Sequence, residues 1–164
     1  MRIATWNVNS LRARLEKVAW WIERAAPDVL LMQETKLADA DAPRSAFVER
    51  GYELAHHGQG RWNGVAIVSR VGLDDVVAGF SDQATGEGAE ARLLWATCAG
   101  VRVASVYVPN GREVGTEHYE AKLAWLERLR AHARSLMGSG HPVALCGDFN
   151  IIPEDIDVYV PERW

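Results

Sequence analysis

Apolar residues in the first part of the chain alternate between a helical period and short continuous runs. Residues 2–8 have the composition of a strand, and apolar residues then recur at helical spacing over Leu11–Ala25, with Ser10 placed to cap the helix. After Pro27, residues 28–33 form a nearly continuous apolar run, as in a strand buried on both faces. The order strand, helix, strand predicts a βαβ unit.

The rest of the chain continues this pattern with more strands. A second helix is expected from about Asp41 to Gly51, with Pro43 in its first turn. A last helix is predicted between Tyr119 and Leu136, where apolar residues again recur at helical spacing. Strands are predicted at 52–57, 65–69, 73–77, 92–98, 101–108 and 143–146, the last of them buried, with an acidic loop at 82–90.

Length and composition indicate one globular domain, residues 1–164, because 48% of the 164 residues are hydrophobic. Cys98 and Cys146 lie in apolar runs without CxxC spacing, so we expect reduced, buried thiols and no zinc site. The N-terminal residues lack an apolar stretch long enough for a signal peptide or a membrane span. A soluble, cytoplasmic protein is therefore the expectation.

The formal net charge of −4 gives no overall attraction to nucleic acid. DNA binding would need a local basic surface or a bound cation. Carboxylates that hold a divalent metal lower the net charge of the chain while creating a positive centre in the loaded protein. The charge therefore counts only mildly against DNA.

Polar side chains follow three of the predicted strands. Asn7 follows the first, Glu34 the second, and Asp148 and Asn150 the last. Because the functional crevice of an open α/β sheet lies beyond the carboxyl ends of its strands, we expect these side chains to meet. They are candidate ligands for Mg²⁺, or Mn²⁺, whereas zinc would favour His or Cys. Each residue alone could equally be a turn or cap residue, so the prediction depends on their convergence.

Five short blocks make the interpretation more specific. They read WNVN at 6–9, QETK at 33–36, NGVA at 63–66, YVPNG at 107–111 and GDFN at 147–150. In order and spacing the chain resembles the exonuclease III family of abasic-site endonucleases, part of the endonuclease/exonuclease/phosphatase superfamily. The resemblance runs from residue 1 to about 157.

The resemblance implies a role for each candidate residue. Glu34 corresponds to the main carboxylate ligand of a catalytic Mg²⁺, and Asn7 to a second contributor to the metal site. Asp148 corresponds to the residue that transfers a proton, and Asn150 to the one that orients or stabilises the phosphoryl group. Tyr107 corresponds to a tyrosine whose hydroxyl reaches the phosphate, although a half-buried strand tyrosine would explain it too.

The resemblance also implies an α/β fold, as part of a four-layered sandwich in which two packed mixed β-sheets are flanked by helices. Family members continue further and contribute a late aspartate and an Asp-His pair that have no counterpart here. None of the five histidines has a neighbouring aspartate in the sequence, so we expect no substitute. We therefore expect a C-terminally truncated domain that lacks the second half of the sandwich. Such a chain would expose apolar sheet surface and dissolve poorly. We also expect it to show little or no turnover.

The implied function is a magnesium-dependent DNA phosphodiesterase of base-excision repair. It would incise double-stranded DNA at abasic sites and trim blocked 3′ ends, without an obligate protein partner. Two alternatives remain: a phosphoinositide or sphingomyelin phosphoesterase of the same superfamily, and a non-catalytic remnant with weak metal or DNA affinity. A phosphate-contacting rim is expected from Arg12, Arg14, Lys36, Arg61 and Arg92, although surface solvation would explain any one of them.

Overall fold

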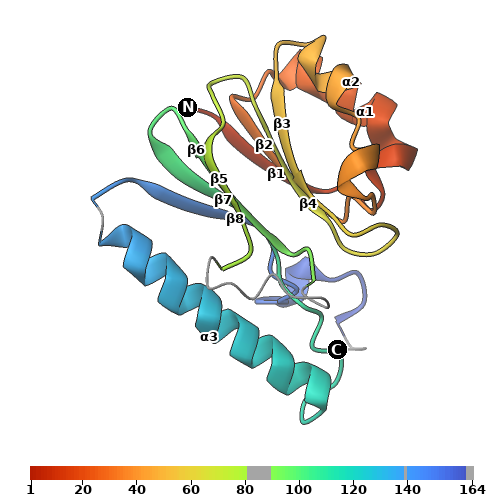
Figure 1. Ribbon diagram of the computed structural model, residues 1–164. Coiled ribbons are helices and arrows are strands. Elements are labelled where there is room, and N and C mark those ends of the chain that lie inside the picture. The colour runs from red at the N-terminus through yellow and green to blue at the C-terminus, as the bar shows by residue number, and fades with distance from the viewer. Residues whose placement is uncertain (81–89, 139, 162–164) are drawn as a thin grey trace.

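The computed structural model describes residues 1–80, 90–138 and 140–161 (Figure 1). The predicted acidic loop at 82–90 lies outside the described residues except for Glu90. The elements are β1 (Ile3–Asn7), α1 (Leu11–Ala25), β2 (Val29–Gln33), the 3₁₀ turn η1 (Asp39–Asp41), α2 (Arg44–Val48), β3 (Glu53–His57), β4 (Val65–Ser69), β5 (Asp74–Ala78), β6 (Leu93–Cys98), β7 (Val101–Tyr107), α3 (Glu117–Met137), β8 (Val143–Asp148) and the 3₁₀ turn η2 (Asp155–Asp157).

The strands form two four-stranded mixed sheets, ordered β1-β2-β4-β3 and β5-β6-β7-β8. The sheets pack face to face, with α1 and α2 outside the first and α3 outside the second (Figure 1). Leu31 and Ile67 of the first sheet meet Leu94 and Val103 of the second, and all four are buried. The predicted α/β arrangement of two packed mixed sheets flanked by helices is confirmed.

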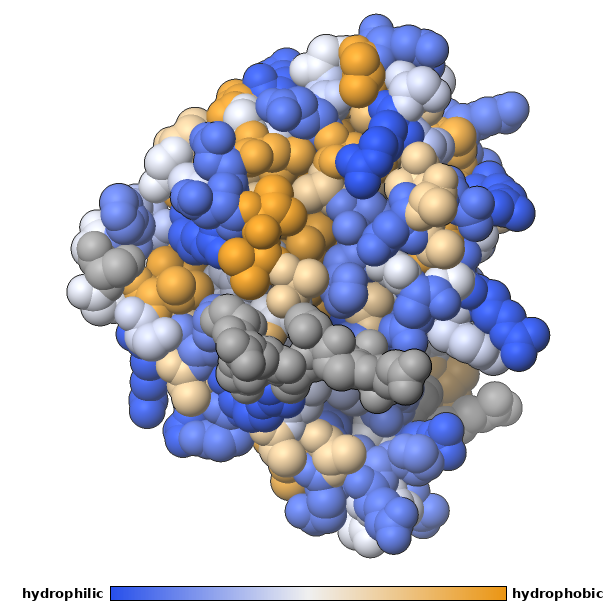
Figure 2. Space-filling model, in the orientation of Figure 1, coloured by the Kyte–Doolittle hydropathy of each residue, from blue (hydrophilic) through white to orange (hydrophobic). Residues whose placement is uncertain are grey.

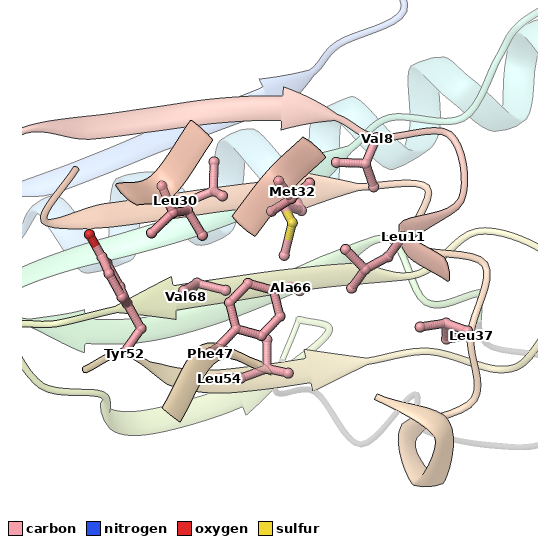
Figure 3. Packing of buried hydrophobic residues seen from close by; sticks show 12 residues of the cluster. Val8, Leu11, Leu30, Met32, Leu37, Phe47, Tyr52, Leu54, Ala66 and Val68 are labelled. Carbon is pink, nitrogen blue, oxygen red and sulfur yellow. The ribbon is translucent and has the colours of Figure 1, made fainter. Parts of the chain in front are cut away.

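In the first sheet, α1 connects the parallel strands β1 and β2, which confirms the predicted βαβ unit. The register places Asn7 beside Gln33, so both strands end at the same edge. The outer face of this sheet is sealed by apolar side chains from α1 and α2 (Figure 3). Phe47 of α2 packs there beside Met32 and Leu54, and each is less than 10% exposed.

The second sheet repeats this geometry with α3 as the crossover. β7 and β8 are parallel, and their register places Tyr107 beside Asp148. Trp95, Val106 and Leu129 form the buried core between this sheet and α3. β1 also lies against β8, so the carboxyl ends of β1, β2, β7 and β8 come together at one end of the sandwich.

The expected single helix from about Asp41 to Gly51 is wrong. The chain forms the short turn η1 and then α2, separated by Ala42 in an extended conformation with ψ 127°. A residue that precedes proline is pushed out of the helical region by the proline ring, and Pro43 follows Ala42 directly. The proline therefore divides the segment instead of starting one longer helix.

The predicted burial of the last strand is also wrong, because every residue of β8 is only half-buried. The strand lies at the edge of the second sheet and pairs with β7 on one side. Cys98 is buried as expected, whereas Cys146 in β8 is half-buried, and both are free thiols. The strand is thus only half-buried because it lies at the edge of the sheet, although its sequence is apolar.

Apolar side chains also reach the surface among charged residues, as Figure 2 shows for one face of the molecule. Trp20, Trp62 and Val114 are more than half exposed. Within the described residues, no helix combines the length and apolar character needed to cross a lipid bilayer.

Candidate active site

The polar residues at the strand ends meet as the sequence predicts. The side-chain amide of Asn7 donates one hydrogen bond to Glu34 Oε1 at 2.9 Å and another to Asp148 Oδ2 at 2.8 Å. The hydroxyl of Tyr107 donates to the same Glu34 oxygen at 3.1 Å. Residues from four strand ends, more than 140 positions apart in sequence, therefore form one hydrogen-bonded cluster.

The backbone around Glu34 is held in an unusual conformation. Glu34 has φ 54°, in the left-handed region that residues with a side chain rarely adopt. Its carbonyl accepts from the Ser10 amide at 2.7 Å, and the next amide, that of Thr35, donates to the Gly64 carbonyl at 3.1 Å. Bonds from both neighbouring segments thus stabilise a conformation that would cost free energy in isolation, and they aim the carboxylate at the cluster.

Electrostatics keeps this carboxylate ionised. Burial alone would raise the pKa of Glu34, but hydrogen bonds from Asn7, Lys36 and Tyr107 outweigh it and bring the pKa below that of an ordinary glutamate. Burial, together with the nearby Glu34 charge, raises the pKa of Tyr107. The site therefore combines an ionised carboxylate with a protonated phenol at neutral pH.

Asp148 and Asn150 form a compact turn at the end of β8. Asp148 Oδ1 accepts from the backbone amide of Asn150 at 2.9 Å, so both oxygens of this carboxylate are hydrogen-bonded. The Asn150 side-chain amide donates to the Val108 carbonyl at 2.8 Å, and Lys122 of α3 donates to the Asn150 carbonyl. Asn150 thus lies next to the cluster, and its side-chain nitrogen binds the turn to Val108.

The chemistry of these donors fits a hard divalent cation. Mg²⁺ in proteins is bound by one or two carboxylates and keeps water ligands for exchange with substrate phosphate. Glu34 and Asp148 supply two carboxylates on either side of the Asn7 amide. In the described part of the chain no group of three or more His, Cys, Asp or Glu residues is placed to hold a metal ion. The ammonium group of Lys36, 2.9 Å from Glu34 Oε2, shows that this oxygen already attracts positive charge.

Three of the five predicted DNA-contacting residues form hydrogen bonds within the protein. Lys36 bonds to Glu34 and also donates to Asn9 Oδ1 at 2.6 Å, and Arg14 donates to the Asn9 carbonyl at 2.5 Å. The Arg92 guanidinium lies 4.6 Å from the centre of the Tyr107 ring and pairs with Glu90, and its side chain is only 12% exposed. Arg92 therefore supports the Tyr107 side chain.

The remaining two, with Lys36, define a basic rim. Arg12, Lys36 and Arg61 line one open hollow of about 410 Å³ beside the Glu34 loop. Arg12 pairs with Asp41 at 3.8 Å, but both side chains are more than half exposed. The hollow is completed by Ser10, Leu37, Ala38, Asp41 and Gly60.

Trp62 is a surface residue that the sequence interpretation missed. Its side chain is 65% exposed, and the Arg61 guanidinium lies 5.6 Å from its ring centre. A solvent-facing tryptophan next to an arginine is a suitable stacking surface for a nucleobase. Its place in a glycine-rich turn just before the NGVA block could have pointed to it.

The chain matches the profile of the endonuclease/exonuclease/phosphatase family over residues 4–163, and it belongs to that family. Among characterised relatives, it is 30% identical to exodeoxyribonuclease III of Haemophilus influenzae, covering 100% of this chain and 64% of the relative. It is 29% identical to an exodeoxyribonuclease of Bacillus subtilis, covering 99% and 63%.

Solved structures agree with this placement. The AP endonuclease from Archaeoglobus fulgidus superposes with a TM-score of 0.89 at 39% identity, over 99% of this chain and 62% of that one. The 3′-5′ exonuclease NExo from Neisseria meningitidis superposes with a TM-score of 0.91, also at 39% identity, over 100% and 63%. The chain therefore spans between 62% and 64% of the length of these relatives.

Proposed function

We propose that this chain carries the catalytic centre of a divalent-metal-dependent DNA phosphodiesterase that incises abasic sites and trims 3′ ends. The main support is the side-chain amide of Asn7, which donates hydrogen bonds to both Glu34 and Asp148 at the point where four strands end. The names of the relatives, exodeoxyribonuclease and AP endonuclease, support DNA as the substrate.

Glu34 would hold the cation, Mg²⁺ or Mn²⁺, with Asp148 beside it. Asn7 would contribute through Oδ1, which accepts a hydrogen bond from the Asn9 amide at 3.0 Å, because its nitrogen donates to the two carboxylates. When bound, such a cation supplies positive charge that stabilises the phosphoryl oxygens as a phosphodiester is cleaved. Lys36 Nζ lies 2.9 Å from Glu34 Oε2, and Oε1 accepts hydrogen bonds from Asn7 and Tyr107, so both oxygens of this proposed ligand are held in place.

The chain's own residues supply the other requirements of hydrolysis. The Tyr107 hydroxyl, which keeps its proton at neutral pH, can donate to a phosphate oxygen. Asp148 is the group that moves a proton, and Asn7 holds its carboxylate in one orientation. Asn150 is the proposed phosphoryl-orienting residue. Its side-chain NH₂ group donates one hydrogen bond to the Val108 carbonyl and has a second N–H that could donate to a phosphate oxygen.

Substrate binding would use the basic rim. Arg12 and Arg61 are the exposed cations of the hollow next to Glu34, and phosphate contacts of this kind position a nucleic acid without reading its sequence. Trp62 would stack against a base at the edge of the hollow. Because the net charge is −4, binding should depend strongly on this local surface.

The test is cleavage of a duplex that contains one abasic site, with Mg²⁺, by the 164-residue chain and by Glu34→Ala. The proposal expects nicking that requires Mg²⁺ and that the substitution abolishes. Faster release of phosphate from an inositol polyphosphate than cleavage of the duplex would favour the other phosphoesterases of the superfamily. Nicking no greater than that of Glu34→Ala would reject the proposal for this chain and favour a non-catalytic remnant.

A further inference from the structure

A chain of buried hydrogen bonds lies directly behind the Glu34 loop. The Nδ1 atom of His56 is 2.7 Å from Asp39 Oδ1, and its Nε2 atom is 2.8 Å from Thr35 Oγ1. A carboxylate can only accept a hydrogen bond, so Nδ1 carries the hydrogen and donates a hydrogen bond to Asp39 Oδ1. In the neutral ring, Nε2 then accepts a hydrogen bond from the Thr35 hydroxyl. We call Thr35, His56 and Asp39 the buried relay.

The inner part of this relay is enclosed. Thr35 is fully buried, and the His56 side chain has no exposed surface. Two glycines are pressed against it: a Cβ atom on Gly64 would lie 2.1 Å from Thr35 Oγ1, and one on Gly58 would lie 2.4 Å from His56 Cε1. The Thr35 hydroxyl therefore cannot reach a substrate, although its arrangement with histidine and aspartate resembles that of an activated nucleophile.

The relay is connected to the cation site through the backbone. Thr35 immediately follows Glu34, whose φ of 54° must be maintained by its surroundings. The Thr35 carbonyl accepts from the Leu11 amide at 3.0 Å, and its amide donates to Gly64. Fixing the Thr35 side chain therefore fixes the peptide unit that sets the direction of the Glu34 carboxylate.

The outer end of the relay reaches the turn that carries Arg61 and Trp62. Asp39 Oδ1 also accepts from the Gly58 amide at 2.8 Å, at the start of that turn. The Asp39 side chain is 54% exposed, so it closes the relay at the surface. One set of bonds thus joins the loop of Glu34 to the segment that forms part of the basic rim.

We propose that Thr35, His56 and Asp39 are positioning residues that hold Glu34 in its cation-binding orientation. This inference rests on the proposed function, because it assigns the relay to the same site. The three residues act through the backbone and touch neither cation nor substrate. Partners behind a metal ligand commonly control affinity in this way, and losing one costs about 10-fold to 100-fold.

The test compares Thr35→Val, which has nearly the same shape but no hydroxyl, with Thr35→Ser, which keeps the hydroxyl. Ser69→Ala is the matched control, because Ser69 is a fully buried hydroxyl at the far end of β4. Mn²⁺ affinity is measured by calorimetry, and amide hydrogen exchange is measured at residues 34–36 and 63–64 without metal. Asp39→Ala serves as a second variant at a half-exposed position, where loss of folding is a small risk.

We expect Thr35→Val to weaken Mn²⁺ binding by about 10-fold to 100-fold and to speed exchange in both segments, with Asp39→Ala changing both in the same direction. Thr35→Ser and Ser69→Ala should stay close to the wild-type chain. Exchange and Mn²⁺ affinity in Thr35→Val that match those of Ser69→Ala would overturn the inference, as would a Thr35→Ser variant as impaired as Thr35→Val. If the wild-type chain binds Mn²⁺ no better than Glu34→Gln, the proposed function fails, and the exchange rates alone then decide whether the relay positions the loop.

Discussion

The two carboxylates of the site are supported very differently. Glu34 follows β2, a strand in which every residue is buried, and its loop is held by Asn7, Lys36, Tyr107 and the buried relay. Asp148 ends β8, an edge strand that is half-buried throughout. Its oxygens are bonded to the Asn7 side chain and to the backbone of its own turn. The proposed cation-binding residue thus follows a fully buried strand, whereas the proposed proton-transferring residue ends a strand with one open side.

This difference suggests a division of tasks that experiments can separate. Electrostatic stabilisation and cation binding require a fixed geometry, which a buried central strand supplies. Proton transfer requires a group that can change its protonation and its partners during the reaction. Substitutions at the Glu34 end should therefore change cation affinity, and substitutions at the Asp148 end should change turnover.

The largest effect is expected for Asp148→Asn, which keeps the shape of the side chain but removes its ability to take a proton. The rate of abasic-site cleavage should fall by about 100-fold to 10,000-fold, the range typical of a lost general acid or base. Mn²⁺ affinity should fall far less. Asp155→Asn in the exposed turn η2 is the control and should leave the rate unchanged. A rate within tenfold of the wild-type chain would contradict the assigned role.

Tyr107→Phe should have an intermediate effect, because it removes one hydrogen bond to an ionised carboxylate. In the proposed reaction the same hydroxyl donates to a phosphate oxygen, and a hydrogen bond to such a charged group contributes about 1.5 to 3 kcal/mol, so kcat/KM should fall by about 10-fold or more. Tyr52→Phe is the matched control, since Tyr52 donates to the Pro27 carbonyl away from the site. It should lower the melting temperature and leave kcat/KM unaffected. Equal losses of kcat/KM in the two variants would argue against a specific role for Tyr107.

Smaller effects are expected at the basic rim. Arg12→Ala and Arg61→Ala should each weaken binding of duplex DNA a few-fold, and each should reduce the slope of log affinity against log salt concentration by about 1. Fluorescence anisotropy over a salt series measures both quantities. Arg130→Ala on α3, where Arg130 pairs with Glu127, is the control. An unchanged salt slope in both rim variants would exclude these residues as phosphate contacts.

The smallest effect concerns pH and stability. Burial lowers the pKa of His56 and His57, although Asp39 acts in the opposite direction on both and Arg44 adds to the lowering at His56. Because the unfolded chain binds these protons first, the stabilisation is complete above the ordinary histidine pKa of about 6.5 and is lost as pH falls below it. The melting temperature should therefore decrease by a few degrees between pH 7.5 and pH 5.5. A His57→Gln variant should show a smaller decrease, and an equal decrease would show that His57 does not contribute.

The sequence predicted the cluster of Asn7, Glu34, Tyr107 and Asp148 because strand ends are visible as a change from apolar to polar residues. It could not predict that Lys36 and Arg92 are used within the protein, since their partners are set by side-chain directions in three dimensions. The bond between Thr35 and His56 was missed for the same reason, because the two residues are 21 positions apart and lie on different elements.

The errors in the fold have local and global causes. The division of the expected second helix follows from the ring of Pro43, which the sequence displays but which can also begin a helix. The half-burial of β8 depends on its place at the edge of a sheet, and the apolar run itself carries no information about neighbours. The spacing of apolar residues therefore predicts where a helix or strand lies more reliably than it predicts how deeply that element is buried.

Calorimetric titration with Mn²⁺ measures whether the cluster of Asn7, Glu34 and Asp148 binds a divalent cation, with Glu34 as the main ligand. The wild-type chain should bind Mn²⁺. Glu34→Gln, which removes the negative charge while keeping the shape, should lower the affinity by more than the roughly 10-fold to 100-fold loss expected for a supporting residue. Glu23→Gln, at a surface pair with Arg50, should bind as tightly as the wild-type chain. Equal Mn²⁺ affinity in the wild-type chain and Glu34→Gln would show that Glu34 is not a ligand of the cation.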